Sequence, residues 1–282
     1  MILQTILLLF GGALGGILGA VLGIGGGIIL TPFLTLVIGL DIKYAIAASI
    51  ISVIATSSGA TIAYLKDDML NLRIAMFLEI ATTIGAIVGT ILASIVAPQF
   101  LFVLFGGFLL FSAVNMIQKL VNKKTEKIAV TSDPLAEKLK LNGSYFEKTT
   151  QQKIDYQVEK VPAGFAMMLA AGLASGLLGI GSGVFKVTAM DTIMKMPLKP
   201  SSATSNLMMG VTAAASAMVY FFNGTIIPEV AAPLSLGVLA GALLGSRIMQ
   251  HLQPKWIRFI FIPVLVLMGL QMVLRGFGVN IG

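Results

Sequence analysis

Long apolar runs separated by short polar loops make up most of the chain. The clearest runs are Lys43–Leu65, Leu72–Val96 and Phe100–Leu120 in the first half, and Lys199–Phe222, Val230–His251 and Trp256–Arg275 in the second. Each run approaches the roughly 20 apolar residues that a helix needs to cross the hydrocarbon core of a bilayer. This pattern predicts three membrane-spanning helices in each half of the chain.

A longer apolar region precedes each set of three runs, and a cluster of glycines interrupts it. The regions are Ile2–Leu40, which contains GIGGG from Gly23, and Pro162–Met196, which contains GIGSG from Gly179. Consecutive glycines weaken a helix by about 1 kcal/mol each relative to alanine. We therefore expect either a helix that is interrupted at the glycines or a hairpin of two helices that meet there.

The two halves of the chain are copies of each other. Adding 156 to a residue number in the first half gives its counterpart in the second half, from Gly23 and Gly179 to Met116 and Met272. Chance matches in a glycine-rich chain would not keep one register over this length. The sequence therefore predicts a duplicated unit.

A polar stretch separates the two copies and holds 15 of the 31 charged residues, between Lys119 and Lys160. The chain thus divides into membrane repeat 1 (residues 1–120), a polar linker (121–161) and membrane repeat 2 (162–282). Within the linker, LKLNGSYFE and KIDYQVEKV alternate apolar and polar residues around an Asn-Gly turn, which is typical of a β-hairpin. A disordered linker is the alternative. Nine lysines against six acids favour the cytoplasmic side of the membrane for this stretch.

Composition supports a membrane protein and excludes several other classes. Hydrophobic residues make up 57% of the chain and charged residues 11%, whereas soluble domains carry about 25% charged residues. Cysteine is absent, which excludes disulfides, and a single histidine, His251, excludes a His-rich metal site. The net charge of +7 is attributed to basic cytoplasmic loops and not to nucleic-acid binding. The first residues, MILQTILLLFGGALGG, lack the basic start of a cleaved signal peptide and are assigned to the first helix.

The positive residues of matching loops exchange places between the two halves. The loop KDDMLNLR carries Lys66 and Arg73, whereas its counterpart FNGTIIPE has neither Lys nor Arg. Conversely, the loop APQF is uncharged, whereas its counterpart region holds Arg247, Lys255 and Arg258. Because positively charged loops stay in the cytoplasm, the exchange predicts halves of opposite orientation. Eight simple spans with parallel halves are the alternative.

The glycine clusters predict a binding site for a small anion. Non-helical backbone at membrane depth is tolerated only where protein buries it or where it lines a cavity. A helix that restarts after each break presents free N–H groups and a positive dipole end, which suits an anion in a transporter of inverted repeats. Tight helix packing is the other explanation for the glycines. The predicted substrate-binding residues, taken from the clusters and the hydroxyl-rich spans beside them, are Gly25, Gly26, Gly27, Gly181, Ser182, Gly183, Lys186, Ser49, Thr56, Ser205, Asn206 and Thr212.

Three ionisable residues lie in the predicted membrane segments, where charge is costly and usually functional. Glu79 lies deep in a span, Lys186 follows Gly183 by three residues, and Asp191 lies further along the same helix. Two roles compete for Lys186, which either binds the anion beside the helix terminus or pairs with Glu79. Glu79 and Asp191 are assigned to ion pairing or to coupling with a proton or cation.

Several of these motifs resemble the TauE/SafE sulfite exporter family. The resemblance lies in GIGGGIILTP, in the polar stretches Ala48-Ser49-Ile50 and Ala203-Thr204-Ser205-Asn206, and in the long central polar loop. The family pattern has Gly where this chain has Ser182 and Pro near Thr188, so the second cluster departs from it. The resemblance implies a transporter that moves small anions, often sulfite, sulfoacetate or other sulfur-containing anions, across the bacterial inner membrane.

Together, these observations predict an all-α polytopic membrane protein of two homologous, inverted repeats. The expected function is secondary transport of a small sulfur-containing oxyanion by alternating access, with the anion and the lipid bilayer as partners and with no cofactor. A carrier of another small solute, coupled to a proton or cation through Glu79 and Asp191, is the first rival. A membrane-embedded enzyme is the second, although the chain lacks a catalytic cluster. The oligomeric state is left open, a homodimer included.

The orientation of the halves is testable because the chain has no cysteine of its own. Asp68 and Gly224 occupy matching loops, so opposite orientation would put them on opposite sides of the membrane. In sealed membrane vesicles, an impermeant maleimide should label Asp68→Cys and Gly224→Cys from opposite sides. Labelling of both cysteines from the same side would mean that the halves are parallel.

Overall fold

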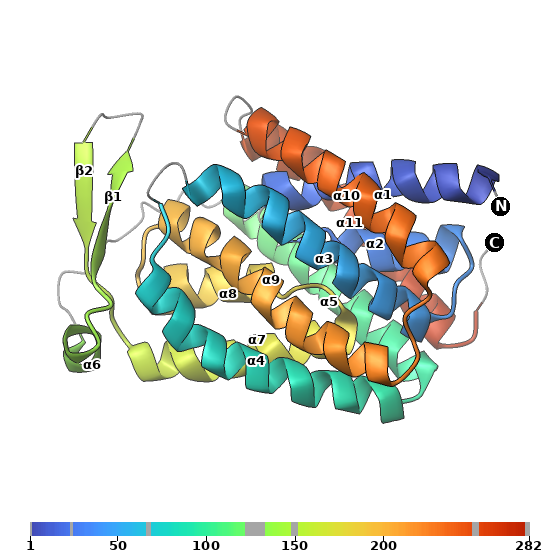
Figure 1. Ribbon diagram of the computed structural model, residues 1–282, viewed down its shortest axis with the longest axis horizontal. Coiled ribbons are helices and arrows are strands. Elements are labelled where there is room, and N and C mark those ends of the chain that lie inside the picture. The colour runs from blue at the N-terminus through green and yellow to red at the C-terminus, as the bar shows by residue number, and fades with distance from the viewer. Residues whose placement is uncertain are drawn as a thin grey trace.

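The structure is a bundle of long helices with a small β-hairpin at one end (Figure 1). This computed structural model describes residues 2–22, 25–65, 69–121, 133–147, 152–249 and 254–279. The first half contains α1 (Ile2–Leu22), α2 (Gly27–Pro32), the π-helical turn η1 (Phe33–Val37), α3 (Ile42–Leu65), α4 (Leu72–Ile95) and α5 (Pro98–Val121). Between the halves lie α6 (Pro134–Lys138), β1 (Gly143–Glu147) and β2 (Gln152–Tyr156). The second half contains α7 (Val161–Leu178), α8 (Gly183–Thr188), the π-helical turn η2 (Ala189–Ile193), α9 (Leu198–Phe222), α10 (Pro228–Met249) and α11 (Pro254–Gly276).

The helices of the two halves correspond at the offset found in the sequence. The bounds of α2 and η1 match those of α8 and η2 residue for residue. The first residues of α3, α4 and α5 are likewise the counterparts of the first residues of α9, α10 and α11. Among the described residues, seven helices are long and apolar enough to cross a membrane, namely α1, α3, α4, α5, α7, α9 and α10. The prediction of an all-α polytopic membrane protein is confirmed.

Each glycine cluster lies at the tip of a helical hairpin. In the first half, α2 folds back along α1, because Gly19 faces Gly26 and, further back, Gly15 faces Leu30. In the second half, α8 and η2 pack on α7 in the corresponding way. Of the two arrangements expected from the sequence, the hairpin is the one that the structure adopts.

Glycine seams let helices from opposite halves approach closely. Gly16 on α1 faces the backbone of α10, and Gly241 on α10 faces the backbone of α1 in return. Gly85 and Gly89 on α4 face the backbone of α7 in the equivalent contact. A Cβ at any of these positions would overlap a main-chain carbonyl, so these glycines serve close helix packing.

Counterpart helices run antiparallel where they pack together. Ser57, late in α3, contacts Asn206, early in α9. Likewise, Val103 near the start of α5 contacts Gly276 at the end of α11. The contact of α1 with α10 is matched by that of α7 with α4.

The part of the polar linker that the structure describes is folded. β1 and β2 pair antiparallel, with Gly143 opposite Tyr156 and Glu147 opposite Gln152. The expected hairpin is confirmed, but Asn142-Gly143 is not its turn. This dipeptide lies at the open end of the hairpin, because the Asn142 carboxamide oxygen accepts a hydrogen bond from the backbone of Val158. The residues that connect the strands, 148–151, lie outside the described residues.

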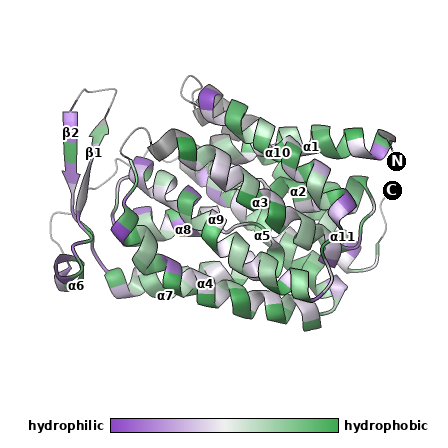
Figure 2. Cartoon of the chain, in the orientation of Figure 1, coloured by the Kyte–Doolittle hydropathy of each residue, from purple (hydrophilic) through white to green (hydrophobic). Residues whose placement is uncertain are grey.

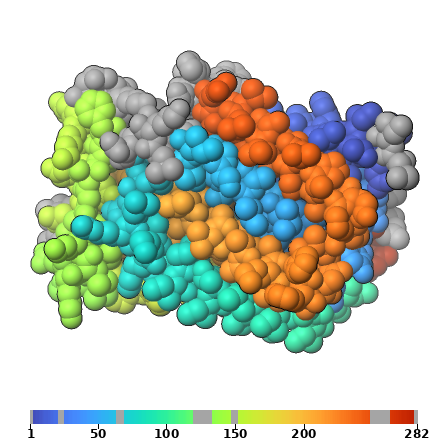
Figure 3. All heavy atoms as spheres, viewed as in Figure 1, coloured from blue at the N-terminus to red at the C-terminus, as the bar shows by residue number. Residues whose placement is uncertain are grey.

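The linker covers one end of the bundle (Figure 3). Asn71 caps α4 by accepting a hydrogen bond from the Ile74 backbone, and its Nδ2 donates to Leu141 O and to Tyr156 Oη, at 2.9 Å each. Arg73 donates to the Lys140 carbonyl. Burial raises the pKa of Tyr156, so its phenol stays protonated near neutral pH. These bonds fasten the hairpin to the start of α4.

The outer surface of the bundle is apolar. Exposed hydrophobic side chains cover α1, α4, α9 and α10, among them Leu3, Met76, Ile95, Phe222 and Leu236. Hydrophilic residues gather instead at the hairpin end (Figure 2). This distribution matches a multi-pass protein whose helices face lipid.

Close packing at the glycine seams can be tested by adding one methyl group. Gly241→Ala should lower the free energy of unfolding by about 1–3 kcal/mol, because the added methyl group forces the two helix backbones apart. Gly107→Ala is the matched control, since no atom lies within 4 Å of a Cβ added at Gly107. Thermal unfolding of both variants in detergent measures the difference. Equal melting temperatures would contradict the close contact.

Candidate substrate and ion-pair site

The two glycine breaks, which lie far apart in the sequence, pack against each other inside the bundle. Gly27 faces the Gly179 carbonyl and the Cα of Ile180, where a Cβ would overlap the main chain. A Cβ at Gly25 would lie 3.5 Å from the Ile180 carbonyl oxygen, and one at Gly181 would press on Val53 of α3. The two breaks therefore cover each other in part, and α3 and α9 pack alongside them.

The breaks use backbone conformations that side chains disfavour. The φ angle is +72° at Gly25, +66° at Gly179 and +69° at Gly181. Ser182 also has a positive φ of +51°, whereas its counterpart Gly26 has a φ of −62°. A left-handed conformation costs a non-glycine residue about 1–2 kcal/mol. Strained positions of this kind cluster at binding sites, which draws attention to Ser182.

Serine hydroxyls hold both breaks from equivalent positions. Ser49 Oγ on α3 lies 3.2 Å from the Gly179 carbonyl oxygen and 3.5 Å from that of Gly27, so it bridges the two breaks. Its counterpart Ser205 on α9 donates to the Gly183 carbonyl at 3.4 Å. These two serines, predicted from symmetry, thus contact the breaks directly.

Two buried polar atoms beside the second break lack a hydrogen-bond partner within the described part of the chain. They are Ser182 Oγ and Asn206 Oδ1, on residues that are 1% and 0% exposed. Buried polar atoms are nearly always hydrogen-bonded, so these two are available to a ligand or to water. At the first break, Thr56 Oγ1 would contact a Cβ at Gly26, at 3.4 Å.

A buried charge pair adjoins the second break. Lys186, which is fully buried, donates from Nζ to Thr212 Oγ1, and its Nζ lies 3.8 Å from Glu79 Oε2. The Thr212 hydroxyl donates to Glu79 Oε1 at 2.6 Å, and the Thr83 hydroxyl donates to the same oxygen at 3.2 Å. Of the two roles that compete for Lys186, pairing with Glu79 is the arrangement in this structure.

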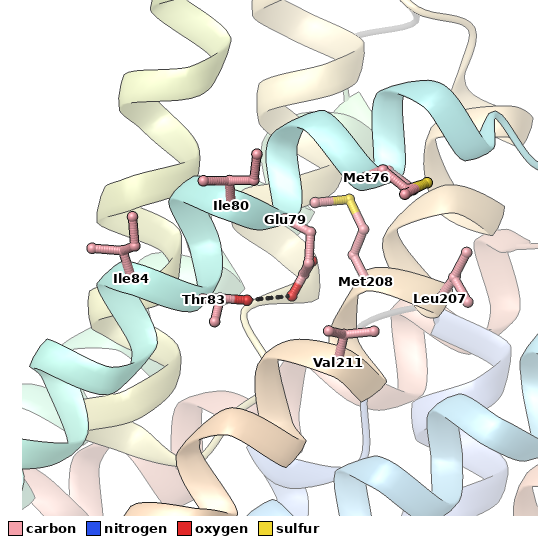
Figure 4. A pocket seen from close by; sticks show the side chains of 9 residues that line it. Met76, Glu79, Ile80, Thr83, Ile84, Leu207, Met208 and Val211 are labelled. Carbon is pink, nitrogen blue, oxygen red and sulfur yellow. Dashed lines mark hydrogen bonds between the residues drawn. The ribbon is translucent and has the colours of Figure 1, made fainter.

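Glu79 also borders a groove of about 490 Å³ between α4 and α9 (Figure 4). Apart from Glu79 and Thr83, the lining is apolar and consists of Ala75, Met76, Ile80, Ile84, Leu207, Met208 and Val211. The Glu79 side chain is 12% exposed, whereas Lys186 is closed off. The carboxylate is thus the member of the pair that reaches open space.

Most of the predicted site residues fall into two adjoining groups. The break group holds Gly25, Gly26, Gly27, Gly181, Ser182, Gly183, Ser49, Thr56, Ser205 and Asn206, and the charge group holds Lys186, Thr212 and Glu79. Asp191 lies on η2, beyond the end of α8, and is only partly buried. The contacts that define the two groups do not include it.

Thr83 is the member of the charge group that sequence reasoning missed. It follows Glu79 by four residues, a spacing that places two side chains on one face of a helix, so the signal was present. Nothing in the sequence indicated that Ser57 of α3 would donate to the carbonyl of Asn206 on α9. Over the described residues, no three His, Cys, Asp or Glu side chains come together as metal ligands would.

Long apolar helices, paired hairpins with buried backbone breaks and an intramembrane charge pair are features of a polytopic membrane transporter. The chain belongs to the TauE/SafE sulfite exporter family, because the family model described as "Sulfite exporter TauE/SafE" matches residues 8–272. No solved structure matches the chain.

Curated relatives cover almost the whole chain. The probable membrane transporter protein YunE of Bacillus subtilis is 26% identical over 97% of this chain and 99% of its own length. A probable membrane transporter protein of Methanocaldococcus jannaschii is also 26% identical, over 97% of both chains. YdhB of Bacillus subtilis, with the same description, is 24% identical over 90% of this chain and 92% of its own. The protein is therefore a membrane transporter of this family.

The charge pair makes a specific prediction about stability. Lys186→Met leaves Glu79 buried without its counter-charge, which should destabilise the protein by about 3–5 kcal/mol. Lys186→Met combined with Glu79→Gln removes both charges and should recover most of that loss. Thermal unfolding of both variants and of Glu79→Gln measures the coupling. Additive effects of the two substitutions would mean that the residues do not interact.

Proposed function

We propose that this protein is a secondary transporter of a small, sulfur-containing oxyanion that works by alternating access. The observation that carries the proposal is the meeting of two glycine breaks, one from each repeat, beside a buried lysine. Both breaks start a short helix, Gly27–Val37 and Gly183–Ile193, whose first N–H groups have no earlier turn to bond to. A buried position with such donors suits an anion.

The second break supplies most of the groups that would bind the anion. Ser182 Oγ is a buried donor without a partner in the described residues, and Lys186 contributes a full positive charge one turn further along α8. Ser49 and Ser205 would bind from the two central helices. A sulfur oxyanion presents several acceptor oxygens around one centre, which matches donors that converge from several elements.

Opposite orientation of the two repeats is part of the proposal. The antiparallel packing of counterpart helices supports it, because membrane-spanning copies that run antiparallel enter the bilayer from opposite sides. Basic residues also gather at the hairpin end, where α4 and α9 begin and α10 ends; they are Arg73, Lys160, Lys195, Lys199 and Arg247 (Figure 1). By the positive-inside rule, the proposal puts this end and the polar linker in the cytoplasm. It also puts the protein in the plasma membrane, as the family resemblance implies.

The family description supports the substrate class. The matching family is described as a sulfite exporter, and sulfite is a small oxyanion of the kind that the site would hold. Two repeats that pack through one pair of breaks could rock about them, so that the anion faces each side of the membrane in turn.

The proposal is tested by ligand-induced stabilisation of the purified protein. Sulfite, thiosulfate, sulfate, methanesulfonate and acetate should be compared, and at least one sulfur oxyanion should raise the melting temperature more than acetate does. Ligand at 100 times its Kd adds about 2.7 kcal/mol of stability. Uptake of the same labelled anion into proteoliposomes then establishes transport. If no sulfur oxyanion stabilises the protein or crosses the membrane, the proposal is wrong.

The role of Ser182 has a variant that should not harm the fold. Ser182→Gly relieves the positive φ and should stabilise the unliganded protein, while the loss of the hydroxyl should weaken anion binding severalfold. Lys140→Gly, at another positive φ but in the linker, is the matched control and should leave anion binding unchanged. Equal anion affinity in Ser182→Gly and the native protein would remove Ser182 from the site.

A further inference from the structure

The Lys186–Glu79 pair joins α8 of the second repeat to α4 of the first, and the matching positions in the opposite repeats carry no charge. The counterpart of Lys186 is Leu30, which is fully buried, and the counterpart of Glu79 is Ser235. The equivalent hairpin and α10 are built with these uncharged residues. The charge pair is therefore not required to form this fold unit, and a role beyond the fold has to account for it.

The hydrogen bonds of the pair are incomplete. An ammonium group has three donors, and the described contacts of Lys186 Nζ use one of them, toward Thr212 Oγ1. The separation of 3.8 Å from Glu79 Oε2 is an ion-pair distance and is too long for a hydrogen bond. Glu79 Oε2 is itself buried and has no hydrogen-bond partner among the described residues. The ammonium can accept a new anionic partner, and the carboxylate has an oxygen that is free to take a proton.

Over the part of the chain that the structure describes, Lys186 is the charged group within ion-pair distance of Glu79. On the elements packed around it, Arg73 lies at the start of α4 and bonds to Lys140, Lys199 lies at the start of α9, and Asp191 lies on η2. The described hydrogen bonds to the Glu79 carboxylate come from the uncharged hydroxyls of Thr83 and Thr212. The charge balance of the site therefore depends on Glu79, Lys186 and whatever ligand joins them.

Charge balance at a buried site couples the anion to a proton. The empty pair is neutral, so a monovalent anion that binds beside Lys186 would leave one uncompensated negative charge in a low-dielectric environment. Protonation of Glu79 removes that charge and restores neutrality. Of the two charged side chains, Glu79 is the one that is partly exposed, at 12%, which makes it the group to take up the proton.

We infer that this protein takes up one proton on Glu79 for each anion that it binds at Lys186, and that it carries the two together. The inference rests on the proposed anion transport. In the binding step, the anion replaces the Glu79 carboxylate as the partner of the Lys186 ammonium, which keeps its three protons. One proton passes from water to Glu79 Oε2, and the neutral acid keeps its contacts with Thr83 and Thr212. Release on the other side of the membrane reverses both events.

The direct test is proton uptake during binding. Methanesulfonate and thiosulfate are suitable probes, because neither changes its charge between pH 6 and pH 8. Either anion is added to the purified protein in a weakly buffered solution that contains a pH indicator. Binding should consume about one proton for each anion that binds. The Kd should then rise by about tenfold per pH unit over the range in which binding takes up one proton.

The variants separate coupling from binding. Glu79→Gln, a neutral copy of the protonated acid, should still bind the anion but without proton uptake and with an affinity that no longer depends on pH. Glu229→Gln, which removes an exposed acid from the first turn of α10, is the matched control and should retain uptake. The measurement on the native protein does not depend on how well any variant folds.

The outcomes distinguish this inference from the function on which it rests. Anion binding by the native protein without proton uptake would overturn the coupling and leave anion transport intact. Proton uptake that persists in Glu79→Gln would assign the proton to another group and overturn the role of Glu79. Failure of both probes, and of the whole anion panel, to bind the native protein would overturn the proposed function and the coupling together.

Discussion

Backbone that leaves the helical conformation inside a membrane must be covered by protein, and the rest of this structure depends on that requirement. The hydrocarbon core offers no water to bond to free N–H and C=O groups. Here each repeat buries the break of the other, because Gly27 packs on the Gly179 carbonyl without room for a Cβ. The hairpins and the close contact between the halves both meet this one constraint.

The same constraint explains where the small residues lie. For the breaks to meet, α1 must pack on α10 and α4 on α7 at backbone contact, and glycines at Gly16, Gly85 and Gly241 permit this. Hydroxyls replace the missing main-chain partners near the breaks, and Ser49 reaches both of them. The outer helix faces remain free to contact lipid.

Asymmetry between the repeats distinguishes the chemistry of the site from its architecture. Two copies with matching helices differ at Leu30 and Lys186, and a lone lysine at this depth would be strongly unfavourable. Glu79 comes from α4, in the other half of the chain, and compensates the charge through Thr212. The pair therefore ties the two repeats together electrostatically as well as sterically.

The sequence by itself determined the membrane class, the duplication, the helix positions and the residues at the breaks. These features are written in local composition and in a fixed register, which need no knowledge of distant contacts. From the sequence we expected a hairpin in the linker, but with its turn at Asn142-Gly143, where the structure has none. Alternation of apolar and polar residues indicates which segments are strands and not how they pair. The sequence left open whether Lys186 pairs with Glu79, and it gave no sign that Ser49 would bridge both breaks. Only the tertiary structure decided these points, since residues more than 100 positions apart meet through helix packing, which no local pattern encodes.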